Sequence, residues 1–197
     1  MMNDPTYRWI AWLFEAFLWG GELVGDENLK EGPAVFVSNH LGAVGPIAVL
    51  ACLPVRVYPW VISDMLDNDK SAAYLNQDFV ERQLHLVPPL SLWVANAISK
   101  ISVRLLRSAG CVPVWQGEKL HELGELYYER TGKSLRFYPV AVHLDSYCVK
   151  IGRPIAYNSK NHPANERLRI KNVLESSIRE MYLDMGMKGF PGIPIQH

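Results

Sequence analysis

Five short apolar runs, rich in β-branched and aromatic residues, are separated along the chain by longer segments with helical periodicity. The runs are typical of buried strands and lie at 34–38, 55–62, 111–115, 135–142 and 147–151. Helices are expected at 46–53, 72–84, 92–108, 118–130 and 164–184. Strands that alternate with helices tend to pair in parallel, because each crossover helix returns the chain across one face of the sheet. The pattern predicts an α/β fold with a mostly parallel central sheet and helices on both faces.

A single α/β domain is expected over residues 26–185, after an apolar segment at 1–25 and before a Gly- and Pro-rich tail at 186–197. The first segment predicts a helix with one narrow polar stripe, since Arg8, Glu15 and Glu22 are seven residues apart. Its apolar stretch is shorter than the roughly 20 residues that span a bilayer. This helix either packs onto the domain or lies in a membrane interface, where tryptophan is favoured.

The charge balance gives no general attraction to nucleic acid. Lys plus Arg and Asp plus Glu both number 20, so the net charge is zero, and no nucleic-acid-binding motif is present. Cys52, Cys111 and Cys148 lie in apolar stretches without metal-binding spacing, which favours buried thiols in a reducing compartment. We therefore expect a cytoplasmic protein, whose N-terminal helix would make any peripheral contact with the cytoplasmic face of the membrane.

Asn39 and His40 occupy the position at which α/β sheets place their ligands. They follow the strand expected at 34–38, and Pro46 suits the first turn of the next helix. An imidazole can take a proton from a hydroxyl near neutral pH. Free amides at the start of a helix can hold an anion or a developing oxyanion. His40 is therefore a candidate general base; the alternative is a structural or solvated loop histidine.

Three parts of the chain resemble, in order, motifs of the lysophosphatidate and glycerol-phosphate acyltransferase family. Residues 34–40, followed by 46–50, resemble the first motif, and 110–114 resemble the second. Residues 138–142, followed by 149–155, resemble the fourth motif and the strand after it. The resemblance implies a glycerol-phosphate acyltransferase-like fold.

In that family a histidine deprotonates the acceptor hydroxyl, which attacks an acyl thioester. The resemblance therefore implies His40 as the catalytic base with Asn39 beside it, and acyl-CoA or acyl carrier protein as the donor. It implies a lipid or small-molecule acceptor and requires neither a metal nor a bound organic cofactor. Substrate contacts are expected in the second and fourth motifs, at Gly110, Val112, Pro113, Pro139 and Val140.

The chain also departs from the family pattern. The family has an orienting aspartate five residues after the histidine, where this chain has Gly45. Loss of such a carboxylate slows a triad enzyme by about four orders of magnitude. Gln116 stands where an arginine is expected after the second motif, and the third motif, which carries a second phosphate-binding arginine, is not recognisable. Asp64 and Asp145, near the ends of expected strands, are candidates to replace the missing carboxylate.

A basic stripe on the helix expected at 92–108 is the candidate replacement for the missing arginines. Lys100, Arg104 and Arg107 are four and three residues apart and so share a face. The stripe could bind a phosphate, a carrier-protein surface or anionic lipid headgroups. The alternative is a solvated face whose cations favour the carboxyl end of the helix.

The leading hypothesis is an acyltransferase that uses an acyl thioester, with His40 as base. The alternative is a non-catalytic module that binds lipid or acyl chains, or contacts the membrane, on a degenerate acyltransferase scaffold. A third possibility is a hydrolase that combines His40 with an unidentified nucleophile. Cys111 is not expected to be that nucleophile, because apolar surroundings raise a thiol pKa.

Overall fold

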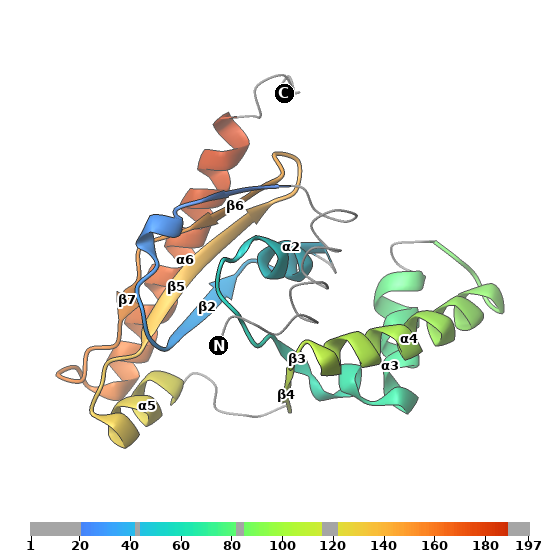
Figure 1. The fold of residues 1–197 in the computed structure, drawn as a ribbon, viewed down its shortest axis with the longest axis horizontal. Coiled ribbons are helices and arrows are strands. Elements are labelled where there is room, and N and C mark those ends of the chain that lie inside the picture. Colours follow the sequence, from blue (N-terminus) through green and yellow to red (C-terminus); the bar gives the residue numbers. More distant parts are fainter. Residues whose placement is uncertain (1–20, 42–43, 82–84, 116–121, 189–197) are drawn as a thin grey trace. The chain divides into compact units, whose positions relative to one another are not determined.

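The computed structural model describes residues 21–41, 44–81, 85–115 and 122–188 (Figure 1). They form two compact units. The described residues of 8–55 and 119–197 form the sheet unit, and those of 56–118 form the helical unit. The apolar helix expected within 1–25 lies outside the described residues as far as residue 20, and so does the tail from 189. The last part of the segment at 1–25 was wrongly expected to be helical, because Glu22–Val24 form a strand that pairs with Cys148–Lys150. The expected domain boundaries stay a prediction.

A five-stranded sheet organises the sheet unit, and four of its strands lie in the order β1-β6-β5-β2. β1 pairs with β6 and β2 pairs with β5 in parallel, whereas β5 pairs with β6 and β7 in antiparallel fashion. The strands are β1 (Glu22–Val24), β2 (Ala34–Ser38), β5 (Arg136–His143), β6 (Cys148–Ile151) and β7 (Ile155–Ala156). A short 3-10 helix, η1 (Asp26–Asn28), links β1 to the chain that enters β2.

Three α-helices complete the sheet unit: α2 (Val44–Cys52), α5 (Leu123–Thr131) and α6 (Pro163–Lys188). The side chains of β5 alternate between the two faces of the sheet. Ala141 packs in a cluster with Met181 and Met185 of α6. Tyr138, on the other face, stacks on Phe36 at a ring distance of 5.2 Å. Helix α2 packs against β5 and β6 opposite α6 (Figure 1). The predicted α/β class, with a mostly parallel sheet covered on both faces, is confirmed. Two of the four pairings in this sheet are parallel, and so is the pairing of two further strands in the helical unit, which makes three of five in the described residues.

Helix α6 is longer than the sequence suggests. It was expected to end at Asp184 before a tail that starts at Gly186, but it continues to Lys188. Met185 is only 6% exposed and packs against β5 and β6. This burial stabilises the last turn, so the helix continues past Gly186 although glycine is a poor helix former. Gly186 also lies against His143, because a Cβ built there would be 3.1 Å from the imidazole Nε2.

The helical unit contains a two-stranded parallel sheet of β3 (Trp60–Ile62) and β4 (Val112–Val114). Its remaining elements are η2 (Ser63–Leu66), α3 (Asn68–Leu75), the π-helix η3 (Asn76–Val80) and α4 (Leu90–Ser108). The strand expected at 55–62 is confined to its last three residues. The helix expected at 72–84 starts earlier, at Asn68, since the Asp67 side chain accepts the backbone N–H of Lys70 and caps the first turn.

Helix α4 presents a face of small residues to α3. The buried positions are spaced four apart and are Ser91, Ala95, Ser99 and Val103. The Ser99 and Ser71 hydroxyls are hydrogen-bonded across this contact. Gly110, expected to cap the helix in a left-handed conformation, has φ of +75°. Within the described residues, no helix combines the length and apolar character needed to cross a membrane.

Candidate functional site

The carboxyl end of β2 is fixed by an unusual side-chain bridge. Ser38 is in register with Val140 of β5. One residue later, Asn39 Nδ2 donates to the Val142 carbonyl oxygen at 2.9 Å, and the Val142 N–H donates to Asn39 Oδ1 at 2.8 Å. The amide thereby replaces a pair of backbone hydrogen bonds and continues the ladder beyond β2. Both polar groups of the Asn39 side chain are hydrogen-bonded to the backbone of Val142. These bonds fix the point at which the chain leaves the sheet.

His40 follows this bridge directly and is exposed. Its backbone leads into a turn in which the Gly45 N–H donates to the Leu41 carbonyl oxygen at 3.2 Å, at the start of α2. No side chain among the described residues forms a hydrogen bond or ion pair with the imidazole. The ring is therefore accessible at the carboxyl edge of the sheet, and no carboxylate of residues 21–41, 44–81, 85–115 or 122–188 pairs with it.

Gly45, at the position of the family aspartate, is buried but not tightly enclosed. A Cβ built there would be 3.4 Å from Leu41 Cβ and 3.7 Å from the Asn39 carbonyl oxygen. These are ordinary van der Waals distances, and the residue does not have a positive φ. A Cβ can therefore be added at this position without displacing the backbone.

Neither carboxylate proposed from the sequence contacts His40 among the described contacts. Asp145 is exposed in the turn that follows β5. Because β5 runs parallel to β2, this turn lies at the same edge of the sheet as His40. Asp64 belongs to the helical unit, where it pairs with Lys70 at 3.5 Å.

The residues of the second and fourth motifs fall in different units. Gly110, Val112 and Pro113 lie around β4 in the helical unit, and the sheet unit contains β5 with Pro139 and Val140. Both β5 side chains are completely buried in the sheet. The Pro139 carbonyl oxygen accepts the Gly152 N–H at 2.8 Å. The sheet unit thus places His40 and Asn39 at the end of β2, with Pro139 and Val140 paired beside the last residues of that strand.

The three cations of the basic stripe are exposed on α4. Arg107 donates from Nη2 to the Leu66 carbonyl oxygen at 2.7 Å and so ties α4 to η2. Lys100 and Arg104 have no hydrogen bond or ion pair within the described part of the chain. Two of the three cations are therefore free to meet an external anion.

A second histidine, which the sequence did not single out as functional, closes the turn between β5 and β6. His143 Nδ1 accepts hydrogen bonds from the Ser146 backbone N–H at 3.1 Å and from its hydroxyl at 2.9 Å. The ring lies 4.8 Å from that of Tyr182 in α6 and is 9% exposed. Since Nδ1 accepts a backbone N–H, the neutral ring carries its proton on Nε2, and this histidine acts as a turn-closing acceptor.

Two of the three thiols are poor nucleophiles. Burial raises the pKa of Cys111 to about 11, as expected from its apolar surroundings. Burial and the nearby Glu22 carboxylate also raise the pKa of the Cys148 thiol. Across residues 21–41, 44–81, 85–115 and 122–188, no group of three His, Cys, Asp or Glu side chains is arranged to hold a metal ion.

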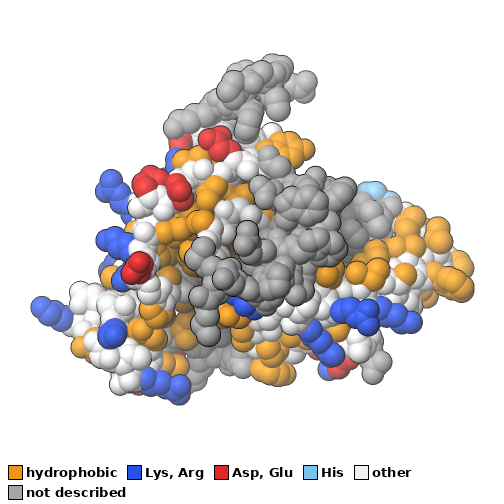
Figure 2. Space-filling model, in the orientation of Figure 1, with side chains coloured by type: hydrophobic (Ala, Val, Ile, Leu, Met, Phe, Trp, Pro, Cys, Tyr) orange, Lys and Arg blue, Asp and Glu red, His pale blue; other side chains and the backbone are white. Residues whose placement is uncertain are grey.

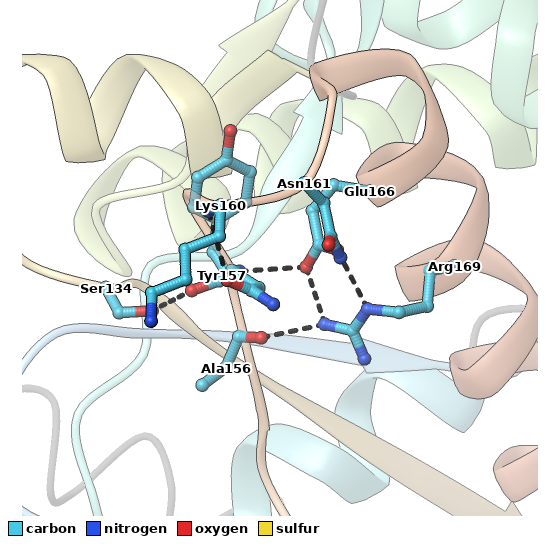
Figure 3. Close-up of polar contacts among 8 residues, drawn as sticks. Ser134, Ala156, Tyr157, Lys160, Asn161, Glu166 and Arg169 are labelled. Atoms are coloured by element: carbon cyan, nitrogen blue, oxygen red, sulfur yellow. Dashed lines mark hydrogen bonds and ion pairs between the residues drawn. The ribbon is translucent and has the colours of Figure 1, made fainter.

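A dense polar network lies where α6 begins, beside the first residues of β5 and so away from His40. Glu166 is fully buried and accepts hydrogen bonds from Asn161, Arg169 and the Asn158 backbone (Figure 3). Arg169 also donates to the Ala156 carbonyl oxygen at 2.9 Å. The hydrogen bond from Arg169 is the main cause of the low pKa of Glu166, about 2. The network joins β7 to α6 and has a structural role.

Comparison of the sequence with protein-family models gives no match, and comparison with curated proteins gives none. Among solved structures, the chain is similar to the crystal structure of the 1-acyl-sn-glycerophosphate (LPA) acyltransferase PlsC from Thermotoga maritima. The two have 13% sequence identity and a TM-score of 0.44, over 92% of this chain and 83% of that one. The α/β class assigned here rests on the strands and helices described above.

Proposed function

We propose that the protein is an acyltransferase that transfers a fatty acyl group from an acyl thioester to a hydroxyl of a lipid or small-molecule acceptor, with His40 as general base. The observation that carries the proposal is the Asn39 bridge to Val142, which holds the accessible His40 at the carboxyl end of β2, beside the buried strand β5. The order of the motifs along the chain supports the choice of reaction.

In the proposed reaction His40 takes the proton of the acceptor hydroxyl, and the hydroxyl oxygen attacks the carbonyl carbon of the thioester. The carbon–sulfur bond then breaks, and the departing thiolate takes the proton back from the imidazolium. Helix α2 begins four residues after His40. The positive end of its dipole would therefore lie near the oxyanion that forms after the attack and before the carbon–sulfur bond breaks. Asn39 is a positioning residue in this scheme, because its polar groups are occupied by β5.

The basic stripe on α4 and the acyl donor are further parts of the proposal. Acyl-CoA and acyl carrier protein both present a thioester next to a phosphate-bearing arm. Lys100 and Arg104, which are exposed and have no partner among the described residues, are candidates to contact such a group. Cytoplasmic location and peripheral membrane contact, which the sequence suggests, fit a donor and an acceptor of this kind.

The test is an assay of labelled acyl-thioester turnover with a panel of acceptors that do and do not carry a phosphate. Wild-type protein is expected to form acylated product, and His40→Ala to form none while it remains folded. The preferred acceptor shows whether the missing arginines have changed the substrate. A His40→Ala protein with full activity would remove the proposed base.

A non-catalytic lipid-binding module is the second candidate, and one observation favours it: no described carboxylate orients His40. Such a module would bind fatty acyl chains or lysolipids saturably without turnover. Calorimetric titration with a lysolipid, run beside the turnover assay, separates the two functions. Binding without product on any acceptor would select the module, and product that depends on His40 would exclude it.

A further inference from the structure

Helix α4 and the loop before it expose large apolar side chains on one side. Val87 is 72% exposed, Leu90 56%, Trp93 80% and Ile101 63%. Leu90, Trp93 and Ile101, with Ala97 between them, are three or four residues apart and form one stripe along the helix. This stripe lies opposite the small residues that face α3. Single exposed apolar residues are ordinary, but a contiguous row that includes a tryptophan marks an interaction surface.

The same surface is basic. Lys100 and Arg104 alternate with Ile101 along it, and neither has a partner within the part of the chain that the structure describes. The sequence from 85 to 115 contains three cations and no Asp or Glu. Figure 2 shows hydrophobic side chains gathered over this part of the molecule, with Lys and Arg side chains beside them. The surface therefore combines apolar area with an uncompensated positive charge.

We propose that α4 docks the protein onto an anionic lipid surface and lies in the plane of the interface. Trp93, Leu90 and Ile101 would enter the boundary between headgroups and acyl chains, while Lys100 and Arg104 would contact lipid phosphates. The chemistry of the partner follows from the charge complement and from the tryptophan, which favours membrane interfaces. The proposal does not rest on acyl transfer.

A lipid surface fits this helix better than a soluble acidic protein does. The stripe from Leu90 to Arg104 extends for about 20 Å along a convex helix. A fluid interface can follow such a shape without a preformed groove. An acidic protein partner would account for the cations. Attraction between charges would not explain why Val87 and Trp93, at the amino-terminal end, are exposed.

The test is co-sedimentation of the full chain with vesicles of phosphatidylcholine alone and of phosphatidylcholine mixed with phosphatidylglycerol. Wild-type protein is expected to bind only the mixed vesicles, and less at high salt. Lys100→Glu with Arg104→Glu should weaken binding by about tenfold or more, given about 1 kcal/mol for each cation at an anionic surface. Trp93→Ala with Ile101→Ala should also weaken it. Lys171→Glu with Arg179→Glu makes the same charge change on exposed positions of α6 and should leave binding unchanged.

Two results would overturn the proposal. One is the absence of binding to mixed vesicles. Binding of an acyl carrier protein through the same residues, without binding to vesicles, would be such a result. The other is equal binding by wild-type protein and both α4 variants, which would place the lipid contact elsewhere on the chain. Neither result depends on turnover, so the acyl-transfer proposal is tested separately.

Discussion

At the scale of single residues, the site depends on a contact that sequence reading does not reveal. The motif Asn39-His40 marks a strand end, but the partner of Asn39 is Val142, 103 positions away. Its two backbone hydrogen bonds show that the asparagine holds the strand end in place, a role that only the fold displays. The sequence predicted His40 as a candidate base from its place after an expected strand, and the family resemblance marked Gly45 as the position of the missing aspartate. The structure shows that His40 is exposed, and its role as base stays a prediction.

Gly45 allows a gain-of-function test. Gly45→Asp restores a carboxylate close to His40, and the site has room for a Cβ. We expect acyl transfer to accelerate by about tenfold or more, a part of the roughly four orders of magnitude that an orienting carboxylate contributes in a triad. Initial rates of the wild-type and Gly45→Asp proteins measure this effect. Gly45→Asn is the control of equal size without charge, and equal rates for the two variants would contradict the carboxylate argument.

Glu166 makes a pH-dependent contribution to stability. Its pKa is lowered from 4.5 to about 2 in the folded protein, chiefly by the Arg169 hydrogen bond. A lowered folded-state pKa stabilises the fold above the unfolded value, and the contribution is lost as the pH falls from about 4.5 towards 2. We expect Glu166→Gln to lower the free energy of unfolding by about 3 kcal/mol at neutral pH.

Urea unfolding of both proteins from pH 7 to pH 3 measures this contribution. The gap between wild type and Glu166→Gln should narrow as the pH falls. Lys171→Gln, at an exposed position of the same helix, is the control and should leave the curve unchanged. A gap that does not vary with pH would mean that the carboxylate charge has no part in the effect.

At the scale of elements, the sequence predicted the strand at 34–38 with its correct ends, and α4 to within two residues at its start. Both have strong local patterns. The misplaced ends have identifiable causes, one local and one elsewhere in the fold. Asp67 starts α3 earlier by capping it, and burial of Met185 carries α6 beyond its expected end. The sequence has no linker-like segment that would have indicated the division into two compact units.

The close packing of α3 and α4 can be tested with one substitution at two positions. Ala95 is 1% exposed on the face of small residues, and Ala97 is exposed on the same helix. We expect Ala95→Leu to destabilise the protein by about 1–3 kcal/mol through overpacking. Ala97→Leu should have almost no effect on stability. Thermal unfolding of the two variants decides, and equal midpoints would show that this face does not pack closely.

At the scale of the whole molecule, the proposed base His40 lies at the carboxyl edge of the sheet unit, and the basic, apolar helix α4 belongs to the helical unit. The first would perform the chemistry and the second would bring the protein to a lipid surface. Each can fail without the other, because vesicle binding needs no turnover and acyl transfer can be measured with short, soluble donors and acceptors. The sequence suggested both features, but only the structure shows that the apolar and basic residues of α4 share an exposed face.

The most direct test of the central claim is a single-turnover measurement of acyl transfer by wild-type protein and by His40→Ala, with circular dichroism to confirm that both are folded. The account predicts acylated product with the wild type and a loss of about two orders of magnitude or more without the imidazole. Equal product formation by the two proteins would show that His40 is not the base and would contradict the account.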